Sequence, residues 1–352
     1  MKKIIKKFNK KIAFVLLVIV FCNFIFSFKS FSNKISVEVE NSLTKKIYPI
    51  GRCIGLKLYT NGVLVIGMSE ITGLDGKNYK PYEKSGISEG DMIKSINGNE
   101  IKNTNELVNI LNSSNGNELS IKYEKNNEEI YTTIKPVLTK NGYMIGLWVR
   151  DAAAGIGTLT YYDESTSRFG ALGHGIIDVD TDKLLHISNG QIVTTQIISI
   201  VKAKKDNPGE IRGIIDNGTE IGQISSNTNI GIYGNVTNKK YIDSIKTNEI
   251  PVANRNQIKK GKAKIMCELE NNKVQEYEIE IKKIYKSSSN EDNKNMLIKV
   301  TDPNLLNITG GIIPGMSGSP IIQNGKFIGA VTNVLLNDPT TGYAIFADSM
   351  IK

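Results

Sequence analysis

Two serines lie in a turn made largely of glycine and proline. The segment GIIPGMSGSP, residues 311–320, contains Ser317 and Ser319 and leads directly into the strand-like stretch IIQNGKFIGAVTN. A serine hydroxyl is a weak nucleophile at its ordinary pKa, so it needs a neighbouring base and an oxyanion site to attack a carbonyl. Flanking glycines let the backbone take unusual dihedral angles and approach a substrate closely. These are the residue types of a nucleophile turn, although most such turns in β proteins do no chemistry.

A serine nucleophile needs a base, and the chain has only two histidines. His174 lies between two glycines in FGALGHGII, at the end of an expected strand. His186 lies in LLHISNG, where no neighbour has an evident chemical role, so we expect it to be a surface or packed structural residue. A lone histidine is usually structural. Its occurrence together with the serine turn favours His174 as the general base.

A carboxylate is expected to orient the imidazole and to stabilise its charged form. Sequence spacing leaves several candidates open, among them Asp178, Asp180, Asp182, Asp216 and Asp302. Asp178 and Asp180 follow His174 closely and can equally be solvated turn residues. Asp302 ends the apolar stretch LIKVT, 15 residues before Ser317. A strand end can hold a buried carboxylate, but an Asp-Pro pair can also form an Asx turn or a helix cap.

Short strands are expected to position these residues. From residue 140 onward the chain is rich in glycine and β-branched residues, and AKIMCELENNKVQEYEIEIKKIY predicts a hairpin about Asn271-Asn272. A second hairpin is expected at Asn324-Gly325, directly after the serine turn. Short strands separated by turns favour a β-barrel or a pair of barrels.

The preceding region mixes strands with one helix. RCIGLKLYTNGVLVIGMSEI predicts a hairpin that turns at Asn61-Gly62. A second turn is expected at Asn97-Gly98, followed by a helix capped by Asn103 with Glu106 three residues later. Two further strands about a polar turn are expected in ELSIKYEKNNEEIYTTIKPV.

The start of the chain predicts a membrane anchor. Ile12–Phe28 is a run of 17 uncharged residues after a lysine-rich segment, which favours an uncleaved signal anchor over a removed signal peptide. The lysines predict that everything after Lys29 lies outside the cytoplasm. Six of the lysines behind the net charge of +9 lie in the first eleven residues. The rest of the chain has no basic stripe, so nucleic-acid binding is not expected.

The remaining cysteines, Cys53 and Cys267, fall in different predicted domains, so two buried free thiols are expected rather than a disulfide. No metal site or other cofactor is expected. His174 and His186 are 12 residues apart and have no clear carboxylate partner for a metal.

Residues 46–139 resemble a PDZ domain, chiefly in GISEGDMIKSINGNEIKN. The resemblance implies binding of a peptide's C-terminal carboxylate on backbone N–H groups, with the peptide added as an extra strand. The matching loop, RCIGLKL, places Ile54, Gly55 and Leu56 at the groove. The alternative is a domain that only packs against its neighbour.

The segment Gly315-Met316-Ser317-Gly318-Ser319-Pro320 has the form G-x-S-G-x-P and resembles the nucleophile turn of chymotrypsin-like serine peptidases. The match implies that Ser317 attacks and that the N–H groups of Gly315 and Ser317 form the oxyanion hole. Ser319 stands at a position usually held by glycine.

Three segments together resemble the stage IV sporulation protein B peptidases of endospore-forming bacteria: AGIGTLTYYDESTSRFGALGHGIIDVDT, the TDP at 301–303, and TGGIIPGMSGSPIIQNGKFIGAVTNVLLNDPTTGYAIF. The resemblance extends to the anchor and the PDZ domain. It implies a serine endopeptidase with the triad His174, Asp302 and Ser317. It also implies export across the forespore membrane and cleavage of a membrane-bound regulator of a processing protease, which switches mother-cell transcription. Self-cleavage within residues 29–50 is a further implication.

The expected chain is mainly β: a basic segment and signal anchor (1–34), a linker (35–45), a PDZ domain (46–139) and a chymotrypsin-like β-barrel peptidase domain (140–352). One rival is a quality-control protease, but in that class the PDZ domain follows the protease. Another is a membrane-tethered adaptor without catalysis, which would not need to keep His174, Asp302 and Ser317.

Overall fold

The computed structural model describes residues 45–351 apart from residues 271 and 286–292, and it leaves the side chains of residues 216–218 undescribed. The predicted anchor, Ile12–Phe28, lies outside the described residues. Within the described part, no helix is both long and apolar enough to cross a membrane.

Strand β1 runs without a turn from Lys46 to Met68. The hairpin predicted at Asn61-Gly62 is wrong, because both sides of this pair face the same partner strand: Tyr59 lies opposite Ala152 and Leu64 opposite Arg150. Gly62, with a φ of 120°, is placed in an irregularity of the pairing between Tyr59 and Leu64. A glycine in the middle of a strand pattern can thus mark a β-bulge instead of a hairpin.

The predicted PDZ region continues from the second half of β1. Its elements are β2 (Ile71–Thr72), β3 (Asn78–Tyr79), β4 (Met92–Ile96), β5 (Asn99–Glu100), α2 (Thr104–Ser113), β6 (Leu119–Lys125), β7 (Glu128–Ile134), β8 (Val137–Thr139) and β9 (Gly142–Met144). The predicted helix is confirmed, and the Asn103 side chain caps it by accepting from the Glu106 N–H. The turn at Asn97-Gly98 is confirmed as well, since both residues have the positive φ that this turn requires.

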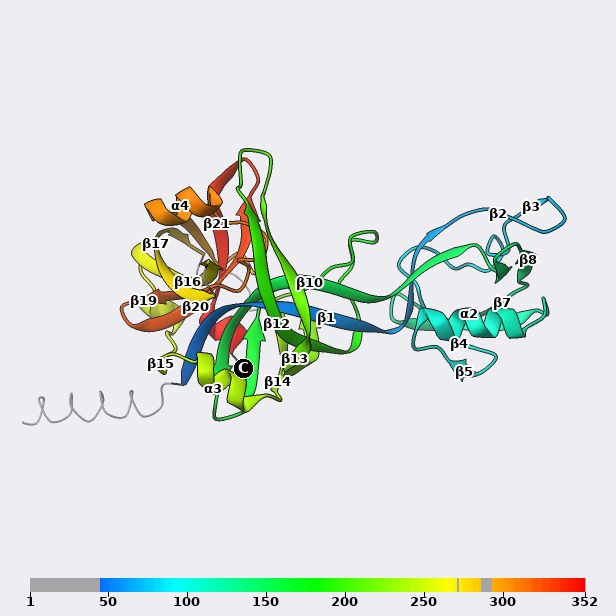
Figure 1. Ribbon diagram of the computed structural model, residues 1–352, viewed down its shortest axis with the longest axis horizontal. Helices are drawn as coiled ribbons and strands as arrows, with labels where there is room; N and C mark the ends of the chain where they lie inside the picture. The colour runs from blue at the N-terminus through cyan, green and yellow to red at the C-terminus, as the bar shows by residue number, and fades with distance from the viewer. Residues whose placement is uncertain (1–44, 271, 286–292, 352) are drawn as a thin grey trace, which may run out of the picture. The chain divides into compact units, whose positions relative to one another are not determined.

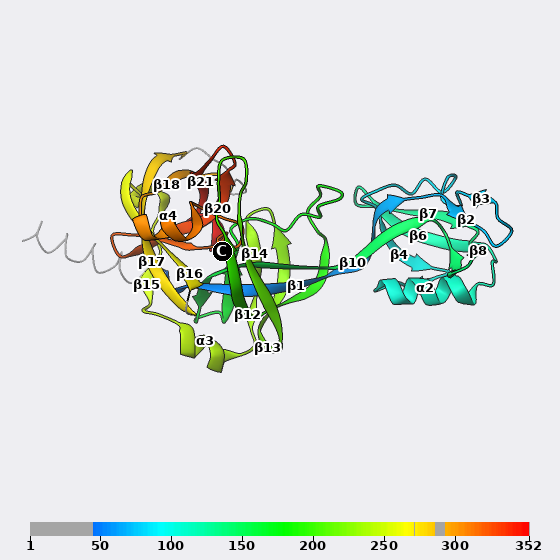
Figure 2. The ribbon, with the colours of Figure 1, turned by 45° about the horizontal axis from the view of Figure 1, so that its top comes forward.

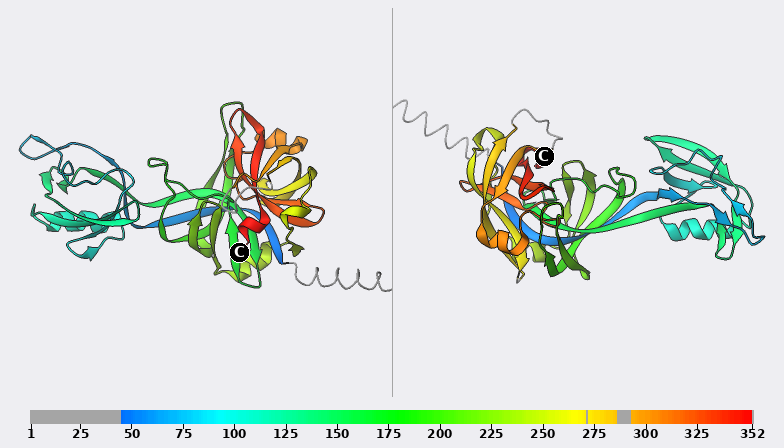
Figure 3. Two further views of the ribbon diagram at one scale, coloured as in Figure 1. Left: turned by 180° about the vertical axis from the view of Figure 1, so that it is seen from behind. Right: turned by 90° about the horizontal axis from the view of Figure 1, so that it is seen from above.

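Six strands form a ring that includes the first half of β1. The other members are β10 (Leu147–Asp163), β11 (Arg168–Ala171), β12 (Ile187–Val201), β13 (Glu210–Thr228) and β14 (Gly231–Val236). Their pairing order is β10-β11-β14-β13-β12-β1, and β1 also pairs with β10, which closes the ring. Figures 1 and 3 show β1 and β10 side by side along their length. The domain boundary predicted at residue 46 is therefore wrong, because residues 46–60 belong to the sheet of the second half.

A second closed barrel follows in the order β16-β17-β18-β21-β20-β19 (Figure 2). The remaining elements are α3 (Lys239–Ile245), β15 (Ile250–Pro251), η1 (Arg255–Gln257), β16 (Gly261–Glu270), β17 (Lys273–Ile284), β18 (Met296–Val300), α4 (Pro303–Thr309), β19 (Pro320–Gln323), β20 (Lys326–Leu335), β21 (Asp338–Phe346) and α5 (Ala347–Met350). Glu270 pairs with Lys273, which confirms the hairpin predicted about Asn271-Asn272, and Gln323 pairs with Lys326, which confirms the one at Asn324-Gly325. The predicted β-barrel is confirmed.

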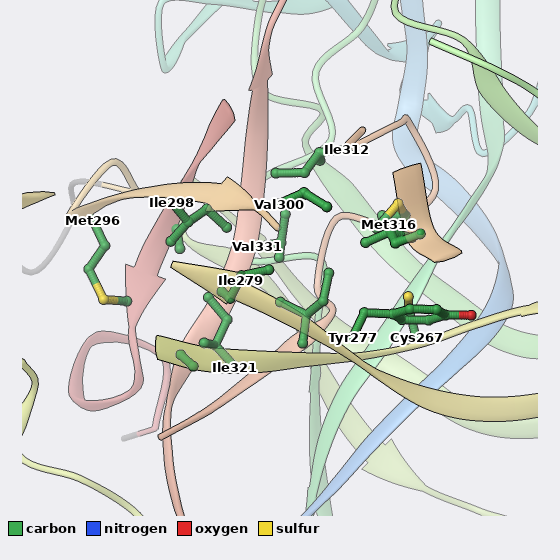
Figure 4. Close-up of a cluster of buried hydrophobic side chains, with 14 of the residues drawn as sticks. Cys267, Tyr277, Ile279, Met296, Ile298, Val300, Ile312, Met316, Ile321 and Val331 are labelled. Atoms are coloured by element: carbon green, nitrogen blue, oxygen red, sulfur yellow. The ribbon is translucent and has the colours of Figure 1, made fainter. Parts of the chain in front are cut away.

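The second barrel is filled by aliphatic and sulfur-containing side chains. Figure 4 shows Ile279, Ile298, Val300 and Val331 pointing toward one another, and Met316 from the serine turn packs into the same cluster. Each is at most 1% exposed. Burial of Met316 anchors the serine turn in the core of this barrel, since a buried side chain of this size contributes about 1.5–3 kcal/mol.

Candidate active site

The serine turn is held against β10 by Thr158. The Thr158 N–H donates to the Ser317 carbonyl at 3.0 Å, and the Thr158 hydroxyl donates to the Gly315 carbonyl at 2.8 Å. On the other side, the Gly318 N–H donates to the Val331 carbonyl at 2.8 Å. These bonds tie the turn to β10 of the first ring and to β20 of the second barrel.

Only glycine fits at position 318. Its φ is 94°, and a Cβ there would stand 2.4 Å from the Thr158 carbonyl oxygen and 2.5 Å from the Leu172 nitrogen. Gly315 has a φ of 101°, a conformation that other residues rarely adopt. The glycines noted in the sequence thus permit the close contact between the turn and β10.

The two serines of the turn differ in burial. Ser319 is fully buried, with 0% exposure, whereas Ser317 is partly exposed. The Ser317 hydroxyl donates to the Thr332 carbonyl at 2.8 Å. Ser317 is therefore the serine of this turn that a substrate can reach.

His174 follows β11 through Leu172 and Gly173, both of which have a positive φ. Its Nδ1 lies 2.8 Å from the Gly175 carbonyl oxygen, which fits a neutral ring that carries its proton on Nδ1 and leaves Nε2 free to accept one. Burial lowers the pKa of His174 below its usual 6.5, and the Gly175 hydrogen bond opposes this shift. The ring is therefore neutral at pH 7, as a general base must be.

His174 and Ser317 line the same cavity, which has a volume of about 200 Å³. The first ring contributes His174 after β11, and the second barrel contributes Ser317 before β19. Among the described residues, the two side chains share no hydrogen bond, because the Ser317 hydroxyl points to Thr332. The imidazole of His174 and the hydroxyl of Ser317 therefore line one cavity without a hydrogen bond between them.

The N–H groups of Gly315 and Ser317 donate no hydrogen bond to any described part of the protein. Both residues border the cavity. Backbone N–H groups that lack a partner at the edge of a cavity can bind an oxyanion, so the geometry suits the oxyanion hole predicted from the turn motif.

Asp302 lies elsewhere in the second barrel. It caps α4, where one carboxylate oxygen accepts from the N–H groups of Asn304 and Leu305 at 2.9 and 3.1 Å. The other oxygen accepts from the Glu278 N–H at 3.1 Å. The alternative of a helix cap at Asp-Pro is therefore what the structure contains. The Asp302 carboxylate accepts these backbone hydrogen bonds and does not contact the His174 ring. The catalytic role of Asp302 stays a prediction.

Three of the other candidate carboxylates, Asp178, Asp180 and Asp182, follow His174 in one loop, and Asp216 belongs to β13. Asp178 is buried and pairs with Arg150 of β10, which also binds the exposed Asp180 at 2.7 Å. Asp178 is thus not a solvated turn residue. Asp182 is exposed, and the side chain of Asp216 is not described.

His186 lies on the surface, where 57% of its side chain is exposed. It does not line the cavity that holds His174 and Ser317. The sequence-based expectation of a surface or packed structural residue is confirmed.

Asn333 was not predicted from the sequence. It lines a second cavity beside His174, and its Oδ1 is buried without a hydrogen-bond partner among the described residues. It follows Thr332, whose carbonyl holds the Ser317 hydroxyl. Buried side-chain oxygen atoms usually have a hydrogen-bond partner, so this unpaired oxygen sets Asn333 apart from most buried polar residues. No local pattern marks this asparagine in the sequence.

The groove predicted at Ile54, Gly55 and Leu56 is wrong. These residues pair with β12 on one side and with β10 on the other, so their backbone cannot accept a further strand. Leu56 instead lines the cavity of His174 and Ser317.

Cys53 and Cys267 are free and buried, as predicted, and burial raises the pKa of the Cys53 thiol to about 12. They belong to one hydrophobic cluster, which corrects their assignment to different domains. The described residues contain no cluster of three or more His, Cys, Asp or Glu side chains that could hold a metal ion.

Comparison with known proteins gives three findings. The family model of the SpoIVB peptidase S55 matches residues 141–351. The zinc metalloprotease RasP of Shouchella clausii (strain KSM-K16) is 37% identical over 79 residues, which are 22% of this chain and 18% of that protein. The PDZ domain of the SdrC-like protein from Listeria monocytogenes is a solved structure with 25% identity and a TM-score of 0.20, and the match covers 25% of this chain and 87% of that one.

The family match spans more than half of the 352 residues and includes both His174 and Ser317. The cavity shared by these two side chains lies within the same matched region, apart from Leu56 and Leu58. The chain belongs to the SpoIVB peptidase S55 family of serine peptidases.

Proposed function

We propose that Ser317 is the nucleophile of an endopeptidase and that His174 is its general base. The Ser317 oxygen attacks a peptide carbonyl while its proton passes to His174, and the oxyanion binds the N–H groups of Gly315 and Ser317. The C–N bond then breaks, the proton passes to the leaving amine, and water hydrolyses the acyl-enzyme. The observation that carries this proposal is the cavity that His174 and Ser317 share.

Catalysis requires the Ser317 hydroxyl to leave the Thr332 carbonyl and turn toward His174. The rotation gives up one hydrogen bond of 2.8 Å, which contributes about 0.5–1.5 kcal/mol. Substrate binding in the cavity can supply that much. The third member of the triad, Asp302, is proposed from the family resemblance alone.

The cellular role follows from the same resemblance. We propose that the chain is exported across the forespore membrane on an N-terminal anchor and cleaves a membrane-bound regulator of a processing protease, which leads to mother-cell sigma-factor activation. Self-cleavage is proposed before Lys46, because β1 begins there and Ile47 and Ile50 are fully buried. A cut within residues 46–50 would remove buried side chains from the fold.

The peptide-binding site of the PDZ region is proposed at another edge. Within the described residues, Leu147–Asp151 of β10 pairs with β1 alone, so its other edge is free. Asp151 also binds the N–H of Thr104 at the start of α2, at 2.7 Å, which places the helix beside this edge. An extended peptide with a free C-terminus can add here as a strand.

The test uses the full chain, wild type beside Ser317→Ala, with intact mass spectrometry over time. We expect the wild type alone to shorten near its N-terminus and to react with a serine-directed fluorophosphonate probe at Ser317. If neither variant shortens and neither reacts with the probe, the peptidase proposal is rejected and the non-catalytic adaptor is favoured.

A further inference from the structure

The cavity beside Ser317 has an almost wholly apolar wall. Apart from His174 and Ser317, it is lined by Leu56, Leu58, Ala153, Ala154, Gly155, Ile156, Leu172, Ile176, Pro314 and Gly315. Leu56 and Leu58 come from β1 and belong to the core of the first ring. None of these wall residues carries a charge or a polar side chain. A charged or polar substrate group that entered the cavity would therefore lose its water without gaining a partner.

The cavity has room for one large side chain. Its volume is about 200 Å³, and an apolar cavity of about 150 Å³ is large enough to hold a benzene molecule. A leucine, isoleucine or phenylalanine side chain therefore fits, whereas an alanine side chain would leave most of the space empty.

Gly155 keeps one side of the cavity open. A Cβ built on Gly155 meets no atom within 4 Å, and its φ is not in the left-handed region. Gly157, two residues further along β10, lies under Leu172, where a Cβ would stand 2.0 Å from that side chain. A larger residue at 157 would displace the buried Leu172 side chain. At 155 no side chain would be displaced, so the small size of this glycine leaves space that a substrate can use.

We propose that this cavity is the specificity pocket of the peptidase and that it takes a large apolar side chain adjacent to the scissile bond. The assignment rests on the proposed function, since the pocket is defined by its position beside Ser317 and His174. The substrate is thus a polypeptide whose cleaved segment carries a leucine-like residue next to the bond that breaks.

Binding to the inert Ser317→Ala chain tests the pocket without requiring catalysis. The probes are fluorescent hexapeptides with acetylated and amidated ends, which have no free carboxylate for the PDZ region and differ only in one central residue: Leu, Ala or Lys. We expect the Leu peptide to bind at least about 10-fold more tightly than the Ala peptide, because a methylene lost from a hydrophobic pocket costs roughly 10- to 200-fold. The Lys peptide should bind more weakly still.

Gly155→Val in the same background should abolish the preference for Leu, because its side chain enters the open space. Ala152→Val is the matched control, since Ala152 lies on the same strand, is exposed and does not line the cavity. Thermal melting checks that each variant folds. Ala154→Leu, at an exposed lining position, replaces Gly155→Val if that variant is unfolded.

Equal binding of the Leu and Lys peptides, or an undiminished Leu preference in the folded cavity variants, would overturn the assignment even if the wild type cleaves proteins through Ser317. The cavity variants could lose the Leu preference while the wild type shows no Ser317-dependent cleavage. That result would support an apolar binding site in the cavity and would reject the peptidase proposal. The two proposals can thus fail separately.

Discussion

At the scale of single residues, the site depends on the protonation state of His174. Burial holds the pKa of this ring below 6.5, so the neutral form that accepts a proton persists into mildly acidic solution. Only the neutral ring can act as the base. The Gly175 carbonyl fixes which nitrogen accepts the proton, since it occupies Nδ1.

The pH dependence of kcat/KM follows from this environment. Activity should be present at neutral pH and should be lost as the pH falls through the lowered pKa of His174. The acid limb of the pH profile of kcat/KM, measured on a peptide substrate with uncharged side chains, is expected to have its midpoint below 6.5. A midpoint above 6.5 would mean that a carboxylate partner or another base controls the reaction.

Asp302 offers a test that separates capping from catalysis. Asn caps helices about as well as Asp, so Asp302→Asn should retain the cap of α4. The variant loses the acceptor for the Glu278 N–H, so it should melt a few degrees below the wild type. If Asp302 orients His174 during the reaction, kcat should fall by about 10⁴-fold. The measurement is kcat beside the melting temperature.

Asn333→Ala is the companion variant, because Asn333 borders the cavity next to His174. If Asp302→Asn keeps the wild-type kcat and Asn333→Ala has a much lower kcat, then Asn333, and not Asp302, orients His174. If kcat falls only in Asp302→Asn, then Asp302 orients His174.

At the scale of elements, the loop after His174 is tied to β10. Arg150 reaches from that strand to Asp178 and Asp180, and the Asp178 carboxylate also accepts from the N–H groups of Asp180 and Thr181. A buried carboxylate that loses its cation keeps the cost of desolvation without the compensating attraction. This ion pair therefore holds the loop that follows His174, the proposed base.

Arg150→Met should release the loop. We expect the free energy of unfolding to fall by about 1–3 kcal/mol, since Asp178 is left buried without its charged partner, and kcat to fall with it. Arg212→Met is the control, because Arg212 forms an exposed pair with Glu210 and should change stability by less than about 1 kcal/mol. The measurements are the free energy of unfolding, from urea denaturation, and kcat, each for both variants. Equal effects would contradict a special role for Arg150.

At the scale of the whole molecule, β1 joins parts that the sequence pattern separates. Its first half lies between β10 and β12 in the first ring. It also contacts the second barrel, because the Cys53 N–H donates to Glu268 at 3.0 Å and Arg52 pairs with the same carboxylate at 3.1 Å. The peptidase fold thus needs a strand that precedes the PDZ region.

A chain that begins at residue 140 should not fold. It lacks β1, so β10 and β12 lose a shared neighbour, and the core loses Ile54, Leu56 and Leu58, each at most 1% exposed. We expect no near-ultraviolet circular dichroism signal and no probe labelling of Ser317, and partial recovery when a peptide of residues 45–60 is added. A folded, probe-reactive 140–352 fragment would restore the boundary predicted from the sequence.

Local signals in the sequence were sufficient for the serine turn, the cap of α2 and the turns at Asn97-Gly98 and Asn324-Gly325. These depend on backbone conformations that glycine and asparagine favour within a few residues. The tertiary structure decided whether Gly62 makes a hairpin or a bulge and which strand edge is free. It also decided that Leu56 lines the cavity of His174 and Ser317 and that Asn333 lines a second cavity together with His174. Each depends on which strand pairs with which across long stretches of chain, and residue types nearby in sequence carry no information about such partners.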